Sequence, residues 1–137
     1  MANNRVPINY NTPAFPSLYD PLPTHHRKEA HYLYYTHDIW RFTLYWTLIF
    51  YGATHLTVAG CAVLTHSRNW SVIWLVPLLY SLVAGVEALM AGSIVGLVLG
   101  QLYESGNFRM STWVPMIWAG VNVMVLVLTS FPMQGGL

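Results

Sequence analysis

The chain has 137 residues, of which 55% are hydrophobic, 15% are aromatic and only 8% are charged. An average soluble domain has about 25% charged residues, so a soluble fold of this composition would lack surface polarity. The net charge of +1, from six Lys and Arg against five Asp and Glu, provides no basic surface that could follow a phosphate backbone, and no nucleic-acid partner is expected. The composition predicts an all-α integral membrane protein.

The segment before the first apolar run divides into two parts. Residues 1–26 contain five prolines among Asn, Thr and Tyr, a composition that interrupts regular structure and offers little apolar surface to bury. We expect a disordered or extended tail there, available to contact a partner. Residues 27–41 lack Gly and Pro and mix charges with Tyr and Trp, which predicts an interfacial amphipathic helix in the headgroup region.

The remainder of the chain contains three long apolar runs. A hydrocarbon core about 30 Å thick needs about 20 apolar residues in a helix. Runs of that kind occupy residues 42–64, 78–100 and 113–131. Pro77 and Pro115 lie at or near the starts of the second and third runs, where a missing N–H costs least. We therefore predict a three-helix transmembrane bundle over residues 42–131, followed by a short C-terminal tail over residues 132–137.

The positive charges predict the orientation in the membrane. Of the six Lys and Arg, five lie in the N-terminal segment or in the loop between the second and third spans, and one, Arg68, lies in the first loop. Because an excess of Lys and Arg marks the cytosolic side of a membrane protein, we expect a cytosolic N-terminus and a lumenal C-terminus.

The second span contains a repeat of small residues. Every fourth position is small, in the order Ala84, Ala88, Gly92, Gly96 and Gly100. On a helix these positions form one broad face, along which another backbone can approach closely. The face would either pack the other spans of this chain or bind a helix of a partner protein. We expect the second span to be the centre of the bundle.

Each span also has one polar residue near its middle: His55, Glu87 and Asn122. Helices of similar tilt would bring the three side chains to one depth. A charge at the bilayer centre costs about 3 kcal/mol on insertion scales, so we expect Glu87 to be protonated, hydrogen-bonded, or facing a wet cavity or a partner. The three residues would then form an interhelical hydrogen bond or carry protons or a cation.

The chain offers little for metal binding or catalysis. His25, His26, His31 and His37 have spacings that match neither HExxH nor a zinc-finger pattern. The spans lack a serine with a histidine and an acid at suitable spacing, a phosphate-binding glycine loop and a paired-carboxylate site. We expect no metal, no cofactor, no catalytic residue and no enzyme activity.

The order of these segments resembles a known family. The run HDIWRFTLYWTLIFYGATHL is followed by VPLLYSLVAGVEALMAGSIVGLVLGQLYESG and by a last span that begins at WVP. Over about residues 36–131 this order is similar to the transmembrane protein 170 family, small three-span proteins of the endoplasmic reticulum. The glycine-spaced second span and its short hydrophilic exit carry most of the resemblance.

The resemblance implies a multi-pass protein of the endoplasmic reticulum membrane or the nuclear envelope, without known enzymatic chemistry. It further implies an association with membrane-sheet shape and nuclear-pore organisation. The expected partners are membrane lipids and a larger membrane or lipid-transfer protein, for which the chain would serve as a membrane subunit. We expect a non-catalytic organiser or adaptor. The alternative is a small transporter or proton-coupled channel subunit that uses His55, Glu87 and Asn122.

Overall fold

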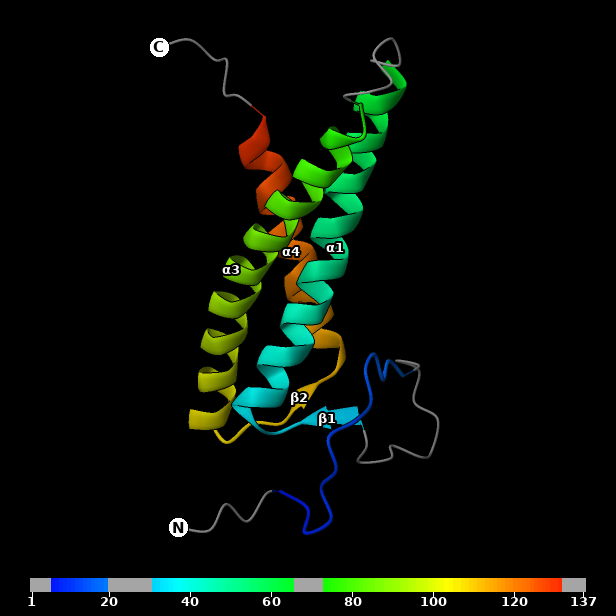
Figure 1. Cartoon of the computed structure of the whole chain (residues 1–137). Helices are drawn as coiled ribbons and strands as arrows, with labels where there is room; N and C mark the ends of the chain where they lie inside the picture. The colour runs from blue at the N-terminus through cyan, green and yellow to red at the C-terminus, as the bar shows by residue number, and fades with distance from the viewer. Residues whose placement is uncertain (1–5, 20–30, 66–72, 132–137) are drawn as a thin grey trace, which may run out of the picture.

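The computed structural model describes residues 6–19, 31–65 and 73–131 (Figure 1). Its elements, in chain order, are β1 (Tyr32–Leu33), α1 (Thr36–Thr65), α3 (Leu75–Ser105), β2 (Met110–Ser111) and α4 (Trp113–Ser130). The three helices are each long and apolar enough to cross a membrane. The prediction of a three-span, helical, multi-pass membrane protein is confirmed.

The start of the first span differs from the prediction. α1 begins at Thr36 and continues without a break into the apolar run, so the described part of residues 27–41 holds no separate interfacial helix. The physical reason is burial, because Asp38, Ile39 and Phe42 are covered by other parts of the chain and not by headgroups. Residues 27–30 of the expected helix, part of the expected tail and the segment 132–137 lie outside the described residues.

The helices differ in length. α1 has 30 residues and α3 has 31, which at a rise of about 1.5 Å per residue gives about 45 Å, well beyond a hydrocarbon core of about 30 Å. α4 has 18 residues and is about 27 Å long. Pro77 and Pro115 are each the third residue of their helix, where neither removes an intrahelical hydrogen bond.

The central helix is α1, which packs against both α3 and α4, whereas α3 and α4 barely contact each other (Figure 1). The expectation that the second span is the centre is wrong. α3 has one face of small residues and applies that face to α1, so no second close-packing surface remains for α4. α4 in turn buries only Pro115 and Ala119.

A two-stranded antiparallel ribbon ties the starts of α1 and α4 together. Leu33 pairs with Met110 and Tyr32 pairs with Ser111. α1 begins three residues after Leu33, and α4 begins three residues after its partner Met110. The two helices therefore start side by side. The buried core lies at this end of the bundle and consists of Leu33, Ile39, Phe42, Leu99 and Met110. We call this the ribbon end.

The described part of the N-terminal tail, residues 6–19, has no helix or strand and is docked on the ribbon end of its own chain. The ring of Phe15 lies 5.2 to 5.5 Å from the rings of Phe42, Tyr45 and Trp46. The hydroxyls of Tyr10 and Thr12 each donate to Asp38 Oδ2 at 3.1 Å. Burial and the nearby Asp38 carboxylate raise the pKa of Tyr10 above its ordinary value.

The last part of this segment contacts the start of α4. Thr112 Oγ1 donates to the backbone oxygen of Ser17, and Trp113 Nε1 donates to that of Tyr19, both at 2.8 Å. The tail therefore crosses from α1 to α4 and covers the ribbon end.

Candidate functional site

The small face of α3 lies against α1 of the same chain. A Cβ added at Gly96 would meet Trp40 and Thr43 at 3.1 and 3.2 Å, and one added at Gly92 would meet Leu44 and Thr47 at 3.1 to 3.2 Å. The face consists of Ala84, Ala88, Gly92, Gly96 and Gly100, all buried. Its described contacts are thus intramolecular, and they require residues without side chains beyond Cβ.

Threonines of α1 form the opposing surface. Thr43 Oγ1 donates to the backbone oxygen of Ile39 at 2.8 Å, and Thr47 Oγ1 donates to that of Thr43 at 2.7 Å. Because each hydroxyl is satisfied within its own helix, both threonines are fully buried without an unpaired donor. The spacing of four residues between these threonines was a sequence signal for this surface.

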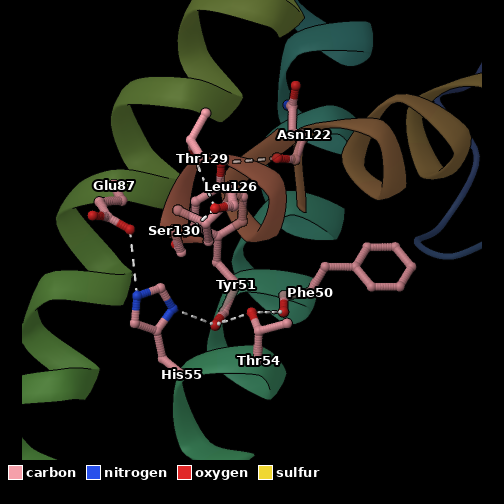
Figure 2. A network of polar contacts seen from close by, with 9 residues as sticks. All are labelled: Phe50, Tyr51, Thr54, His55, Glu87, Asn122, Leu126, Thr129 and Ser130. Atoms are coloured by element: carbon pink, nitrogen blue, oxygen red, sulfur yellow. Dashed lines mark hydrogen bonds and ion pairs between the residues drawn. The ribbon is translucent and has the colours of Figure 1, made fainter. Parts of the chain in front are cut away.

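His55 and Glu87 meet between α1 and α3 (Figure 2). His55 Nε2 lies 3.3 Å from Glu87 Oε2, and His55 Nδ1 lies 2.9 Å from the backbone oxygen of Tyr51. A carbonyl oxygen only accepts, so this hydrogen bond assigns a hydrogen to Nδ1. Glu87 Oε2 is buried and makes no hydrogen bond with a described residue, although it lies within ion-pair distance of Nε2. A basic side chain this close to an acid lowers the cost of placing that acid inside the membrane.

Asn122 does not join this pair. Its amide points away from His55 and Glu87 in Figure 2, and among the described residues its buried Nδ2 has no hydrogen-bond partner. The Tyr51 hydroxyl instead donates to the backbone oxygen of Asn122 at 3.4 Å. The expectation of one depth for all three residues is wrong for Asn122.

The register of the helices explains this difference. α1 and α4 start level, but His55 lies 19 residues after Thr36 while Asn122 lies 9 residues after Trp113. The difference of 10 residues corresponds to about 15 Å along the helix axes. The position of a polar residue within its own span therefore does not give its depth in the bundle.

A groove lies beside the His55–Glu87 pair, near the end of α4. It encloses about 350 Å³. Its lining comes from all three helices and the residue after α4: Thr54, His55, Val58, Tyr80, Glu87, Leu126, Val127, Ser130 and Phe131. We call it the lateral groove.

The lateral groove exists because α4 is short. Counting from the level starts of the two helices, Ser130 at the end of α4 corresponds to Ala53 of α1, and α1 continues for another 12 residues, about 18 Å. Sequence reasoning did not identify Tyr51, Thr54 or Tyr80 as neighbours of the pair. The position of Tyr51, one helical turn before His55, was the available signal.

The described histidines near the N-terminus do not cluster. His31 Nδ1 lies 3.3 Å from the backbone oxygen of Ser17, and His37 Nδ1 lies 3.7 Å from Asp38 Oδ1. His25 and His26 lie outside the described residues. Within residues 6–19, 31–65 and 73–131, no three His, Cys, Asp or Glu side chains gather where they could hold a metal ion.

Comparison with known proteins gives two matches. The model of a family described as "Transmembrane protein 170A/B-like" matches residues 32–137, a segment that begins at β1 and includes all three spans. A protein of Saccharomyces cerevisiae, "Uncharacterized protein YPR153W", is 44% identical over 135 residues, which cover 98% of this chain and 95% of the yeast protein. No solved structure matches.

Proposed function

Because the chain belongs to the transmembrane protein 170A/B-like family, we propose that it is a non-catalytic organiser or adaptor subunit of the endoplasmic reticulum and nuclear envelope membranes. The family expected from the sequence is confirmed, and the chain is a multi-pass membrane protein. In the proposed role the bundle shapes the membrane and anchors a larger membrane or lipid-transfer protein. The resemblance to the transmembrane protein 170 family supports this location and this kind of partner.

The observation that carries the adaptor role is the unpartnered surface of α4. Only two of its 18 residues are buried, and the side chains of Met124 and Leu128, four residues apart, are 65% and 68% exposed. A helix that packs mainly against one other helix offers most of its surface to lipid or to another helix. Because α4 starts at the ribbon end, a partner bound to α4 would be coupled to the docked tail.

Co-purification tests this role. The tagged full-length protein is crosslinked in native membranes, extracted in mild detergent and analysed for stoichiometric partners. We expect one larger membrane or lipid-transfer protein, with at least about a tenfold loss of recovery in Met124→Trp, equivalent to about 1.4 kcal/mol. The matched control is Leu82→Trp on the exposed face of α3, which should retain the partner. Recovery of the chain alone, at normal abundance and monodispersity, would refute the adaptor role.

The location has its own test. The tagged protein should fractionate with markers of the endoplasmic reticulum and nuclear envelope in density gradients. Enrichment with plasma-membrane or mitochondrial markers instead would contradict the proposed location. The result of the co-purification experiment would still stand.

The second candidate function, a proton-coupled transporter subunit, is favoured by one observation. His55 and Glu87, two titratable side chains 3.3 Å apart, border an open groove. Vesicles containing the purified protein would show a pH-driven flux that Glu87→Gln abolishes while the protein stays folded. Such a flux would favour the transporter function over the adaptor function. The absence of a flux in the wild-type protein would exclude the transporter function.

A further inference from the structure

The lateral groove contains an acceptor without a donor. The Glu87 side chain is 41% exposed, and its Oε2 lies 3.3 Å from His55 Nε2. That Oε2 is buried and has no hydrogen-bond partner among the described residues. The nearby hydroxyls of Thr54 and Ser130 donate to backbone oxygens of their own helices at 2.7 to 2.9 Å. A partly exposed carboxyl group inside a membrane that receives no donor from its own bundle is stabilised by a hydrogen-bond donor from outside it.

We propose that the lateral groove binds an uncharged lipid whose headgroup carries a free hydroxyl, such as a diacylglycerol or a sterol. The hydroxyl donates to the Glu87 carboxyl group, and the chain or ring system lies along the apolar wall. This inference goes beyond the proposed adaptor function and does not depend on it.

The electrostatics of the lateral groove select against phosphate. Its lining includes the acid Glu87 and no Lys or Arg. The last turn of α4 ends at Ser130 beside the groove, and its final carbonyl oxygens have no intrahelical partner and carry partial negative charge. A phospholipid would place its phosphate near these oxygens, whereas a hydroxyl offers them and Glu87 a donor.

The shape of the groove fits the apolar part of such a lipid. Val58, Leu126, Val127 and Phe131 form the wall beside the polar pair, and the volume of about 350 Å³ falls in the range of small-molecule sites. Because α4 stops while α1 and α3 continue, the groove opens sideways toward the surrounding lipid.

The test uses photoreactive lipids and the purified full-length protein in phosphatidylcholine vesicles. The probes are a photoreactive diacylglycerol, a photoreactive sterol, and the O-acetylated form of each, which lacks the free hydroxyl. We expect a hydroxyl-bearing probe to label peptides of the groove about fivefold more than its acetylated form, the effect of one hydrogen bond. The probe that labels more identifies the lipid class.

Two matched variants locate the site. Leu126→Trp fills the groove and should abolish the difference between the hydroxyl and acetylated probes, whereas Leu128→Trp, two residues away and outside the lining, should leave it unchanged. Glu87→Leu should lose the difference as well, and Glu87→Gln should keep most of it because an amide oxygen still accepts. Size-exclusion profiles and thermal unfolding check that each variant is folded.

Some outcomes would overturn the proposal. Equal labelling by hydroxyl and acetylated probes would show that the groove does not bind lipids through a free hydroxyl. Selective labelling that persists in folded Leu126→Trp would place the lipid elsewhere, and an absence of labelling above that of bulk lipid would indicate that water or a partner helix fills the groove.

Discussion

The two ends of the bundle are built in opposite ways. At the ribbon end, Leu33 and Met110 are fully buried, and the N-terminal tail covers the contact between α1 and α4. At the other end α4 stops early, and Glu87 borders an open groove. The comparison shows that contacts between distant segments close one end of a small membrane bundle, while a difference in helix length leaves the other end accessible.

The largest expected loss of stability comes from disrupting the close packing of α3 against α1 on the side toward the ribbon end. Gly96→Leu places a branched side chain where even a Cβ would lie 3.1 Å from the Trp40 backbone, so we expect a loss of about 3 kcal/mol or more in stability, or no folded protein. Gly85→Leu is the matched control, because nothing lies within 4 Å of its Cβ position, and should change stability by less than about 0.5 kcal/mol.

Thermal unfolding in detergent, with the folded yield from size exclusion, compares these two variants. Leu97→Ala, at an exposed position beside Gly96, should also be mild. Similar losses for Gly96→Leu and Gly85→Leu would mean that α3 and α1 do not pack as described.

A smaller effect is expected for the docking of the tail. Phe15→Ala removes the ring that contacts Phe42, Tyr45 and Trp46, and we expect about a tenfold increase in proteolytic cleavage within residues 6–19, equivalent to about 1.4 kcal/mol. Phe131→Ala at the groove end should leave that cleavage rate unchanged. A rate equal to that of wild type in Phe15→Ala would show that the tail is not held by its aromatic contacts.

The pH dependence of the same contact is expected to be weaker. Burial and Asp38 raise the pKa of Tyr10 in the docked tail above the ordinary value of 10.0, so deprotonation opposes docking. The stabilisation is fully present below pH 10.0 and is lost as the pH rises through the raised pKa. Cleavage by an alkaline-active protease should increase above pH 10.0 relative to a free peptide of residues 6–19. Tyr10→Phe should lack this increase, and an increase of the same size in that variant would exclude Tyr10 as the cause.

The smallest effect is expected at the His55–Glu87 pair. Glu87→Gln keeps the shape and a hydrogen-bonding oxygen, so stability should change by less than about 0.5 kcal/mol, while Glu87→Leu should be mildly harmful because His55 loses its partner. Thermal unfolding across both variants measures the difference. Unfolding of Glu87→Gln would mean that the pair is an ion pair on which the whole bundle depends.

The number and approximate positions of the spans could be predicted from the sequence because the length of an apolar run is a local property. The small face was visible for the same reason, but its partner was not, since spacing predicts close approach without identifying the opposing helix. The ribbon and the docked tail depend on contacts such as that between Tyr19 and Ser111, 92 residues apart. The separation of Asn122 from His55 depends on where each helix starts, which the ribbon determines.

The most direct measurement for the arrangement around α1 is disulfide crosslinking between its threonines and the small face of α3. Thr43 Cβ lies 3.2 Å from the Cβ position of Gly96, close to the separation of about 3.5 to 4.5 Å found in disulfides. In a Cys61→Ala background, oxidation of the double variant Thr43→Cys, Gly96→Cys should give a crosslinked monomer that migrates faster on a denaturing gel. A crosslinked dimer, or no crosslink in folded protein, would contradict the packing of this face within one chain.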